Sequence, residues 1–100
     1  MKVKSKKWIA REALKKWREQ VLERDKWICQ ICRKKPSRPH VHHIIPRIIK
    51  ELRYDVMNGI VLCFNHHKVG IFSPHLNALW FSNWLRKNKP NQYKYLMMRI

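Results

Sequence analysis

The sequence predicts a small α+β domain, and three observations support this. Apolar residues between positions 8 and 24 recur at three- and four-residue steps, which is the period of a helix with one buried face. Two short runs rich in β-branched residues, 40–45 and 60–63, predict a pair of strands. Pairs of Cys and His adjoin these runs, so a metal is expected to stabilise a chain of only 100 residues.

The first helix is expected over residues 8–24, with Lys and Arg on its exposed side. Asp25 and Lys26 interrupt the apolar period and should end this helix. Its buried stripe is predicted to consist of Ala10, Leu14, Trp17 and Val21.

The centre of the chain reads as strand, long loop, strand and short helix. The first strand should end at Pro46, which lacks a backbone N–H. Asn58–Gly59 favours a turn with positive φ before the returning strand at 60–63. Asn65 is a candidate cap for a helix that starts at His66, and Gly70 should keep that helix short.

The C-terminal part predicts two further helices. Ser73 followed by Pro74 is the pattern of a helix cap with proline in the first turn, and a second helix should start near Pro90. The expected buried face of the first of these helices is Leu76, Leu79, Trp80 and Trp84. Aromatic residues at such spacing are more often core than base-stacking residues, and this interpretation covers Trp80, Phe81, Trp84, Tyr93 and Tyr95.

The charge of the chain predicts a nucleic-acid partner. Lys and Arg number 23 against six acids, which gives a formal charge of +17. Cations that neutralise phosphates release condensed counterions, so we expect binding to the DNA backbone without sequence preference. The sequence has no long apolar segment of the kind that would predict a membrane partner. The charged N-terminus does not resemble a signal peptide, which favours a reducing cytoplasm, in a bacterial host cell.

Two half-sites with matching spacing predict a structural Zn²⁺. Cys29-x2-Cys32 and Cys63-x2-His66 stand thirty residues apart, as in sites where two knuckles close a tetrahedral Cys3His centre. His67 in place of His66 is an open alternative for the fourth ligand. The other interpretation is a set of buried free cysteines, which two matched spacings make less attractive.

A longer pattern contains these half-sites. In order along the chain stand Cys29-x2-Cys32, His42-His43-Ile44-x-Pro46, Asn58 and Leu62-Cys63-x2-His66-His67. With Arg18 and residues 21–25 before it, this pattern resembles the HNH endonuclease family over residues 17–68. The resemblance implies a ββα-metal (His-Me finger) core with flanking helices, in which a hairpin and the next helix hold one divalent cation against the scissile phosphate.

The resemblance also implies roles for single residues. His43 corresponds to the general base, and Asn58 to the residue that fixes the hairpin loop and orients that histidine. His42 and His67 correspond to the ligands of the catalytic metal. Alternation along a strand places His42 and His43 on opposite sides. The alternative is that these histidines cap a strand or act as solvated polar groups.

The chain departs from the family pattern at two positions. His66 stands where the last knuckle cysteine is usual, and His42 where many relatives have Asp. Imidazole ligands favour Mn²⁺, Ni²⁺ or Zn²⁺ over Mg²⁺. The identity of the catalytic cation is left open among these four ions. His40 and His75 lie outside the pattern and are expected at the surface, with a ligand role for His75 as the alternative.

These observations predict a DNA endonuclease that nicks or cuts both strands. Its alternatives are a catalytically silent zinc-dependent DNA-binding module and a packaging-associated interaction protein. We expect one nuclease domain over 1–100, made of a basic helix (1–28), the zinc and ββα core (29–72) and C-terminal helices (73–100). The small format resembles phage HNH proteins, and further partners would be a second copy or phage packaging proteins.

Basic residues are expected to contact the DNA backbone. The main candidates are Lys15, Arg18, Arg47, Lys50 and Arg53. The rest of the N-terminal arm and first helix adds Lys2, Lys4, Lys6, Lys7, Arg11 and Lys16.

Overall fold

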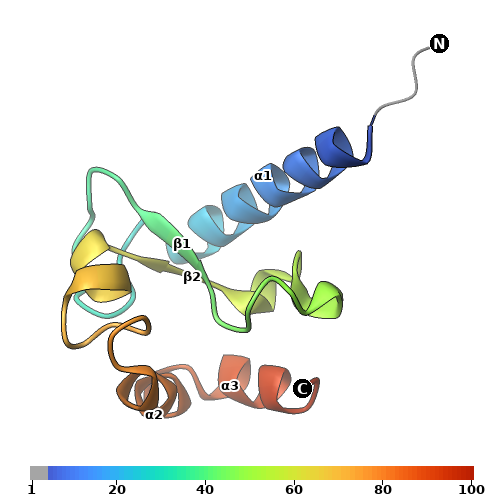
Figure 1. Ribbon diagram of the computed structural model, residues 1–100. Helices are drawn as coiled ribbons and strands as arrows, with labels where there is room; N and C mark the ends of the chain where they lie inside the picture. The colour runs from blue at the N-terminus through green and yellow to red at the C-terminus, as the bar shows by residue number, and fades with distance from the viewer. Residues whose placement is uncertain (1–4) are drawn as a thin grey trace.

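A two-stranded antiparallel hairpin lies between one long helix and a pair of short ones (Figure 1). The structure, a computed structural model, describes residues 5–100, so Lys2 and Lys4 lie outside the described residues. Helix α1 is Lys6–Asp25, strands β1 and β2 are His40–His43 and Gly59–Leu62, and helices α2 and α3 are Ala78–Asn88 and Pro90–Met97. The predicted α+β class and the flanking helices are confirmed.

Helix α1 starts and ends with identifiable caps. The Ser5 hydroxyl oxygen accepts a hydrogen bond from the Trp8 N–H at 3.1 Å, which satisfies one of the first free amides. At the other end Lys26 and Trp27 adopt φ values of 56° and 59°, and the Trp27 N–H returns to the Leu22 carbonyl at 3.0 Å. Burial covers only the second half of the predicted stripe, at Trp17 and Val21, because the first half extends beyond the hairpin.

The hairpin divides the core into two layers by strand alternation. His40 pairs with Leu62 and His43 with Gly59. On β2, Val61 packs on Trp17, Val21 and Leu22 of α1, whereas Ile60 and Leu62 pack with Cys29, Phe81 and Leu85 on the other side. The strands are shorter than expected: β1 stops at His43, before Ile44 and Ile45, and β2 ends at Leu62.

The predicted turn at Asn58–Gly59 is wrong. Gly59 has an extended φ of −121° and is the first residue of β2, while Asn58 ends a short 3₁₀ helix, η2 (Val56–Asn58). Glycine is needed here for close approach: a Cβ atom at Gly59 would overlap the Val21 side chain and lie 2.8 Å from Trp17 Cζ2. The connection also contains a second 3₁₀ helix, η1 (Lys50–Leu52).

The segment after β2 is short, as predicted, and has a wider turn. Asn65–Val69 forms a π-helical turn, η3, that closes with the Gly70 N–H on the Asn65 carbonyl at 2.7 Å. Asn65 does not cap it, since the capping position is Phe64, with no side-chain hydrogen bond.

The predicted start of the next helix at Ser73–Pro74 is also wrong. The Ser73 hydroxyl donates to the Gly70 carbonyl at 2.5 Å, and helix α2 begins at Ala78 with Asn77 Oδ1 accepting from the Trp80 N–H at 3.2 Å. The later start rotates the buried face. Phe81 and Leu85 are buried in place of Leu76 and Leu79, which are 61% and 87% exposed.

Helix α3 begins at Pro90, as predicted, and packs against α2 and the η2 turn. None of the helices within residues 5–100 combines the length and the apolar character needed to cross a bilayer.

Candidate active site

Three cysteines and one histidine converge at the end of the hairpin. Cys29 and Cys32 come from the loop after α1, Cys63 follows β2, and His66 lies in η3; their ligand atoms all lie within 4.8 Å of one another. His66 Nδ1 is 3.2 Å from Cys63 Sγ and 3.9 Å from Cys29 Sγ. Three free thiols and one imidazole are a donor set that fits tetrahedral zinc. This Cys/His cluster can therefore hold a zinc ion.

The neighbouring residues His66 and His67 point into different clusters. His66 joins the cysteines, whereas His67 Nε2 lies 3.1 Å from His42 Nδ1 and 3.1 Å from His75 Nε2. The structure thus favours His66 as the fourth member of the cysteine cluster.

His42, His67 and His75 form the second group, here called the histidine cluster. Burial, together with the charges of the neighbouring histidines, lowers the pKa of His42 to about 3 and that of His67 to about 4. Both imidazoles are consequently neutral near pH 7 and have a lone pair to offer. Three imidazole nitrogens fit a divalent transition metal, and the exposed side of His75 leaves the cluster open to solvent.

His40 contacts the opposite edge of His67. His40 lies two residues before His42 on β1, so both side chains face η3. His40 Nδ1 is 2.9 Å from His67 Nδ1. When His67 Nε2 binds a metal, its Nδ1 carries the hydrogen and can donate it to His40.

His43 occupies the other face of β1, against α1. Its ring stacks on Trp17 with centroids 3.9 Å apart and an interplanar angle of 11°. His43 Nε2 lies 2.9 Å from the Arg53 carbonyl oxygen, which can only accept, so Nε2 is the donor and Nδ1 is the acceptor of the neutral ring. Burial lowers the pKa of His43; the hydrogen bond to the Arg53 carbonyl opposes this and the cations Arg47 and Arg53 add to it, so the net shift is downward and favours the neutral ring.

Asn58 fixes the loop between the strands. Its side chain is fully buried; Oδ1 accepts from the Ile45 N–H at 2.6 Å, and Nδ2 donates to the carbonyls of Ile45 and Leu52, both at 3.0 Å. The Leu52 contact lies next to Arg53, whose carbonyl holds His43. Asn58 and His43 thus contact the carbonyls of two adjacent loop residues, Leu52 and Arg53.

A cleft of about 710 Å³ brings the histidine cluster and His43 together. One wall is β1 with the loop that follows it, and the other is α2 and α3. Arg47 and Lys68 also line it.

The predicted DNA-contacting residues form two groups. Arg47 and Arg53 join Lys7 and Arg11 of α1 around an open hollow of about 780 Å³, which we call the basic hollow. Lys15, Lys50 and Arg18 are exposed and lie outside its lining. The Arg18 guanidinium donates to the Pro39 carbonyl at 3.1 Å.

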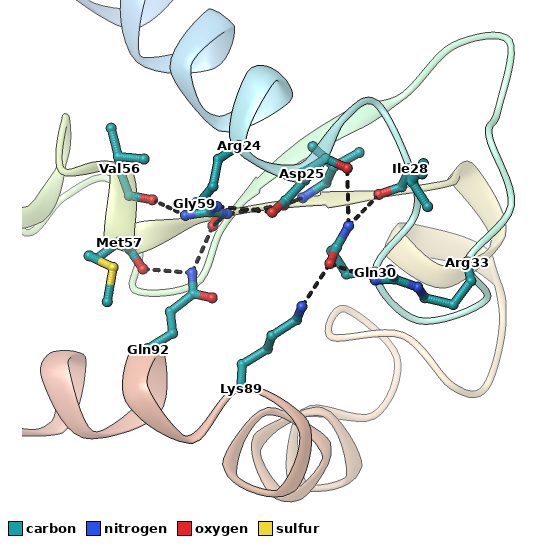
Figure 2. Close-up of polar contacts among 11 residues, drawn as sticks. Arg24, Asp25, Ile28, Gln30, Arg33, Val56, Met57, Gly59, Lys89 and Gln92 are labelled. Carbon is teal, nitrogen blue, oxygen red and sulfur yellow. Dashed lines mark hydrogen bonds and ion pairs between the residues drawn. The ribbon is translucent and has the colours of Figure 1, made fainter.

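A polar network that the sequence analysis missed covers the free edge of β2 (Figure 2). Gln92 of α3 donates to the carbonyls of Met57 and Gly59, both at 2.8 Å, and Arg24 donates to the Gly59 carbonyl at 2.6 Å. Asp25 accepts from the Val61 N–H at 2.9 Å. These side chains hold the strand and the η2 turn that carries Asn58.

The sequence analysis expected two histidines of the site, His40 and His75, at the surface, with a ligand role only as the alternative for His75. The two-residue period of a strand could have indicated that His40 lies on the same face as His42. His75 had no comparable signal, because its approach depends on the path of residues 70–77. The structure brings His75, expected at the surface, into the histidine cluster while leaving it partly exposed.

Comparison with known proteins found one family. The HNH endonuclease family model matches residues 29–69, which span the Cys/His cluster, both strands and η3. The searches of curated proteins and of solved structures found no match. The matched segment contains His42, His43, Asn58 and His67, whereas His75 follows it. Over residues 29–69, this chain is therefore similar to the HNH endonuclease family.

Proposed function

We propose that this chain is a metal-dependent DNA endonuclease in which His43 is the general base. The observation that carries the proposal is that His43 and the histidine cluster line the same cleft. A base and a metal must act on one phosphate, so a shared cleft is what the reaction requires.

His43 Nδ1 takes a proton from the attacking water, while the Arg53 carbonyl and the Trp17 ring hold the imidazole in place. The water oxygen bonds to phosphorus as the bond to the leaving oxygen breaks, and that oxygen takes a proton from solvent. A divalent cation on His42, His67 and His75 would stabilise the negative charge of the phosphate and of the leaving oxygen. The products that the family resemblance implies are a 3′-hydroxyl and a 5′-phosphate.

The ligand set favours a transition metal at the histidine cluster. Hard Mg²⁺ prefers oxygen ligands, and the cluster offers three imidazole nitrogens without a carboxylate among the described residues. We expect activity with Mn²⁺, Ni²⁺ or Zn²⁺ to exceed that with Mg²⁺. The Cys/His cluster would hold a separate structural zinc.

The basic hollow supports DNA backbone binding beside the cleft. Arg47 lines both the hollow and the cleft, so the two adjoin at this residue. A strand whose scissile phosphate lies at His43 can continue across Arg47 onto α1. The contacts would be to phosphates, with Lys15, Arg18 and Lys50 as further exposed cations.

Supercoiled-plasmid cleavage tests the proposal. Zinc-loaded protein is incubated with Mg²⁺, Mn²⁺ or Ni²⁺ in parallel, next to His43→Ala and His67→Ala. Nicked or linear DNA from the wild type, and from neither variant, supports catalysis. Nicked circles indicate that one strand is cut, and linear DNA indicates a double-strand break made by two chains. If all three proteins bind plasmid and none cuts it, the chain is a silent zinc-dependent DNA-binding module. A second copy of the chain and phage packaging proteins stay predicted partners.

A further inference from the structure

The cleft beside the histidine cluster has a second, apolar part. Helices α2 and α3, which follow the family match at residues 29–69, form this wall. Its lining includes Ala78, Phe81, Leu85, Tyr93, Leu96, Met97 and Ile100. Phe81, Leu85 and Leu96 belong to the buried core, so the accessible part of this wall is the partly exposed Tyr93 with Met97 and Ile100, which are 51% and 65% exposed.

The chemistry of the lining fits a nucleotide better than a bare phosphate. Arg47 and Lys68 are its charged residues, and no carboxylate of the described residues lines the cleft. Cationic side chains and a metal ion would suffice to bind the phosphate group of a phosphodiester. The additional apolar surface can stabilise a base and sugar next to it, and about 710 Å³ falls within the size range of sites that enclose small ligands.

A base inside a duplex cannot use this surface, because its neighbours cover both faces. Enzymes that bind a single base in a pocket act on single strands or extrude the nucleotide from the stack. All three residues of the histidine cluster line this cleft, so a phosphate bound at the cluster lies next to the apolar wall.

Resting on the proposed function, we infer that the α2–α3 wall of the cleft binds an unstacked nucleotide next to the scissile phosphate. The preferred substrate is then DNA with unpaired bases, because extrusion costs least where pairing is already lost.

DNA binding of the cleavage-deficient His43→Ala protein tests this inference. Fluorescence anisotropy compares a fully paired duplex with the same duplex carrying unpaired bases at its centre. We expect the unpaired probe to bind about tenfold more tightly, as one base gains contact with an apolar and aromatic surface.

Two matched pairs of variants locate the effect. Ser82 is exposed and lines the cleft, while its neighbour Asn83 is exposed and does not. Ser82→Trp should reduce the preference to about onefold without changing duplex affinity, and Asn83→Trp should retain it. A second pair repeats the comparison after the end of α3 if the first variant fails to fold. Ile100 lines the cleft and Met98 does not, so Ile100→Asp is compared with Met98→Asp.

Equal affinity of His43→Ala for both probes, or a preference that survives in folded Ser82→Trp and Ile100→Asp, would overturn the inference. Binding is read without cleavage, so the result is distinct from the plasmid assay. A plasmid-cutting wild type without any probe preference would leave the nuclease proposal intact.

Discussion

His67 has a ring nitrogen on each edge of its imidazole, and each nitrogen has different neighbours. Nε2 faces His42 and His75, whereas Nδ1 lies 2.9 Å from His40. Histidine ligands of metals usually donate their second N–H to an acceptor, which fixes the tautomer and the ring orientation. His40 is placed to be that acceptor.

Replacing His40 should therefore weaken metal binding without removing a ligand. We expect His40→Ala to lower the affinity of the histidine cluster for Ni²⁺ by roughly 10–100-fold. His40→Asn, which keeps an acceptor oxygen, should recover part of the loss. Isothermal titration of zinc-loaded protein with Ni²⁺ measures this, and unchanged affinity in His40→Ala would show that the contact has no orienting role.

Gly59 is a second position at which a single added carbon atom should change stability. It pairs with His43, and an added methyl group would meet Val21 and Trp17, the residue stacked on His43. We expect Gly59→Ala to lower the free energy of unfolding by about 1–3 kcal/mol through overpacking. Urea unfolding of the zinc-loaded protein measures the change, and wild-type stability in Gly59→Ala would mean that α1 can shift freely.

At the scale of elements, the Cys/His cluster joins three segments of the chain. It joins the loop after α1, the end of β2 and the η3 turn. Because the same turn carries His67, the two clusters should be coupled in position while using separate ligands.

Neighbouring substitutions in η3 should separate the two metals. His66→Ala removes a zinc ligand, and a loss of about 3 kcal/mol would lower the thermal midpoint by roughly 10–25 °C. His67→Ala should keep the zinc of the Cys/His cluster and melt close to the wild type. Zinc content by atomic absorption and melting by circular dichroism report both results, and equal zinc loss in the two variants would contradict the division between the histidines.

The elements that the sequence predicted well are those with local signals. The period of α1, the β-branched strands and Pro90 each depend on adjacent residues, and the family pattern named His42, His43, Asn58 and His67. The start of α2 was mispredicted because Ser73 hydrogen-bonds back to Gly70 and leaves the capping position to Asn77. The approach of His75 to His67 follows from that loop, so spacing alone could not predict it.

At the scale of the whole molecule, the charge of +17 has a local and a general effect on DNA binding. Every cation contributes to long-range attraction, but only those at the backbone displace counterions from particular phosphates. Lys7 and Arg11 belong to the basic hollow, whereas Lys34 and Lys35 are exposed on the knuckle loop away from it. Two double variants with the same charge change can therefore separate the effects.

We expect Lys7→Gln with Arg11→Gln to reduce the slope of log affinity against log salt by about 1.8, since each phosphate contact contributes about 0.9. Lys34→Gln with Lys35→Gln removes the same charge and should leave that slope near the wild-type value while lowering affinity slightly at low salt. Fluorescence anisotropy with a paired duplex over a range of NaCl concentrations gives both slopes. If the two double variants lose the same slope, DNA follows the net charge of the molecule, and the basic hollow has no specific part in positioning the strand at His43.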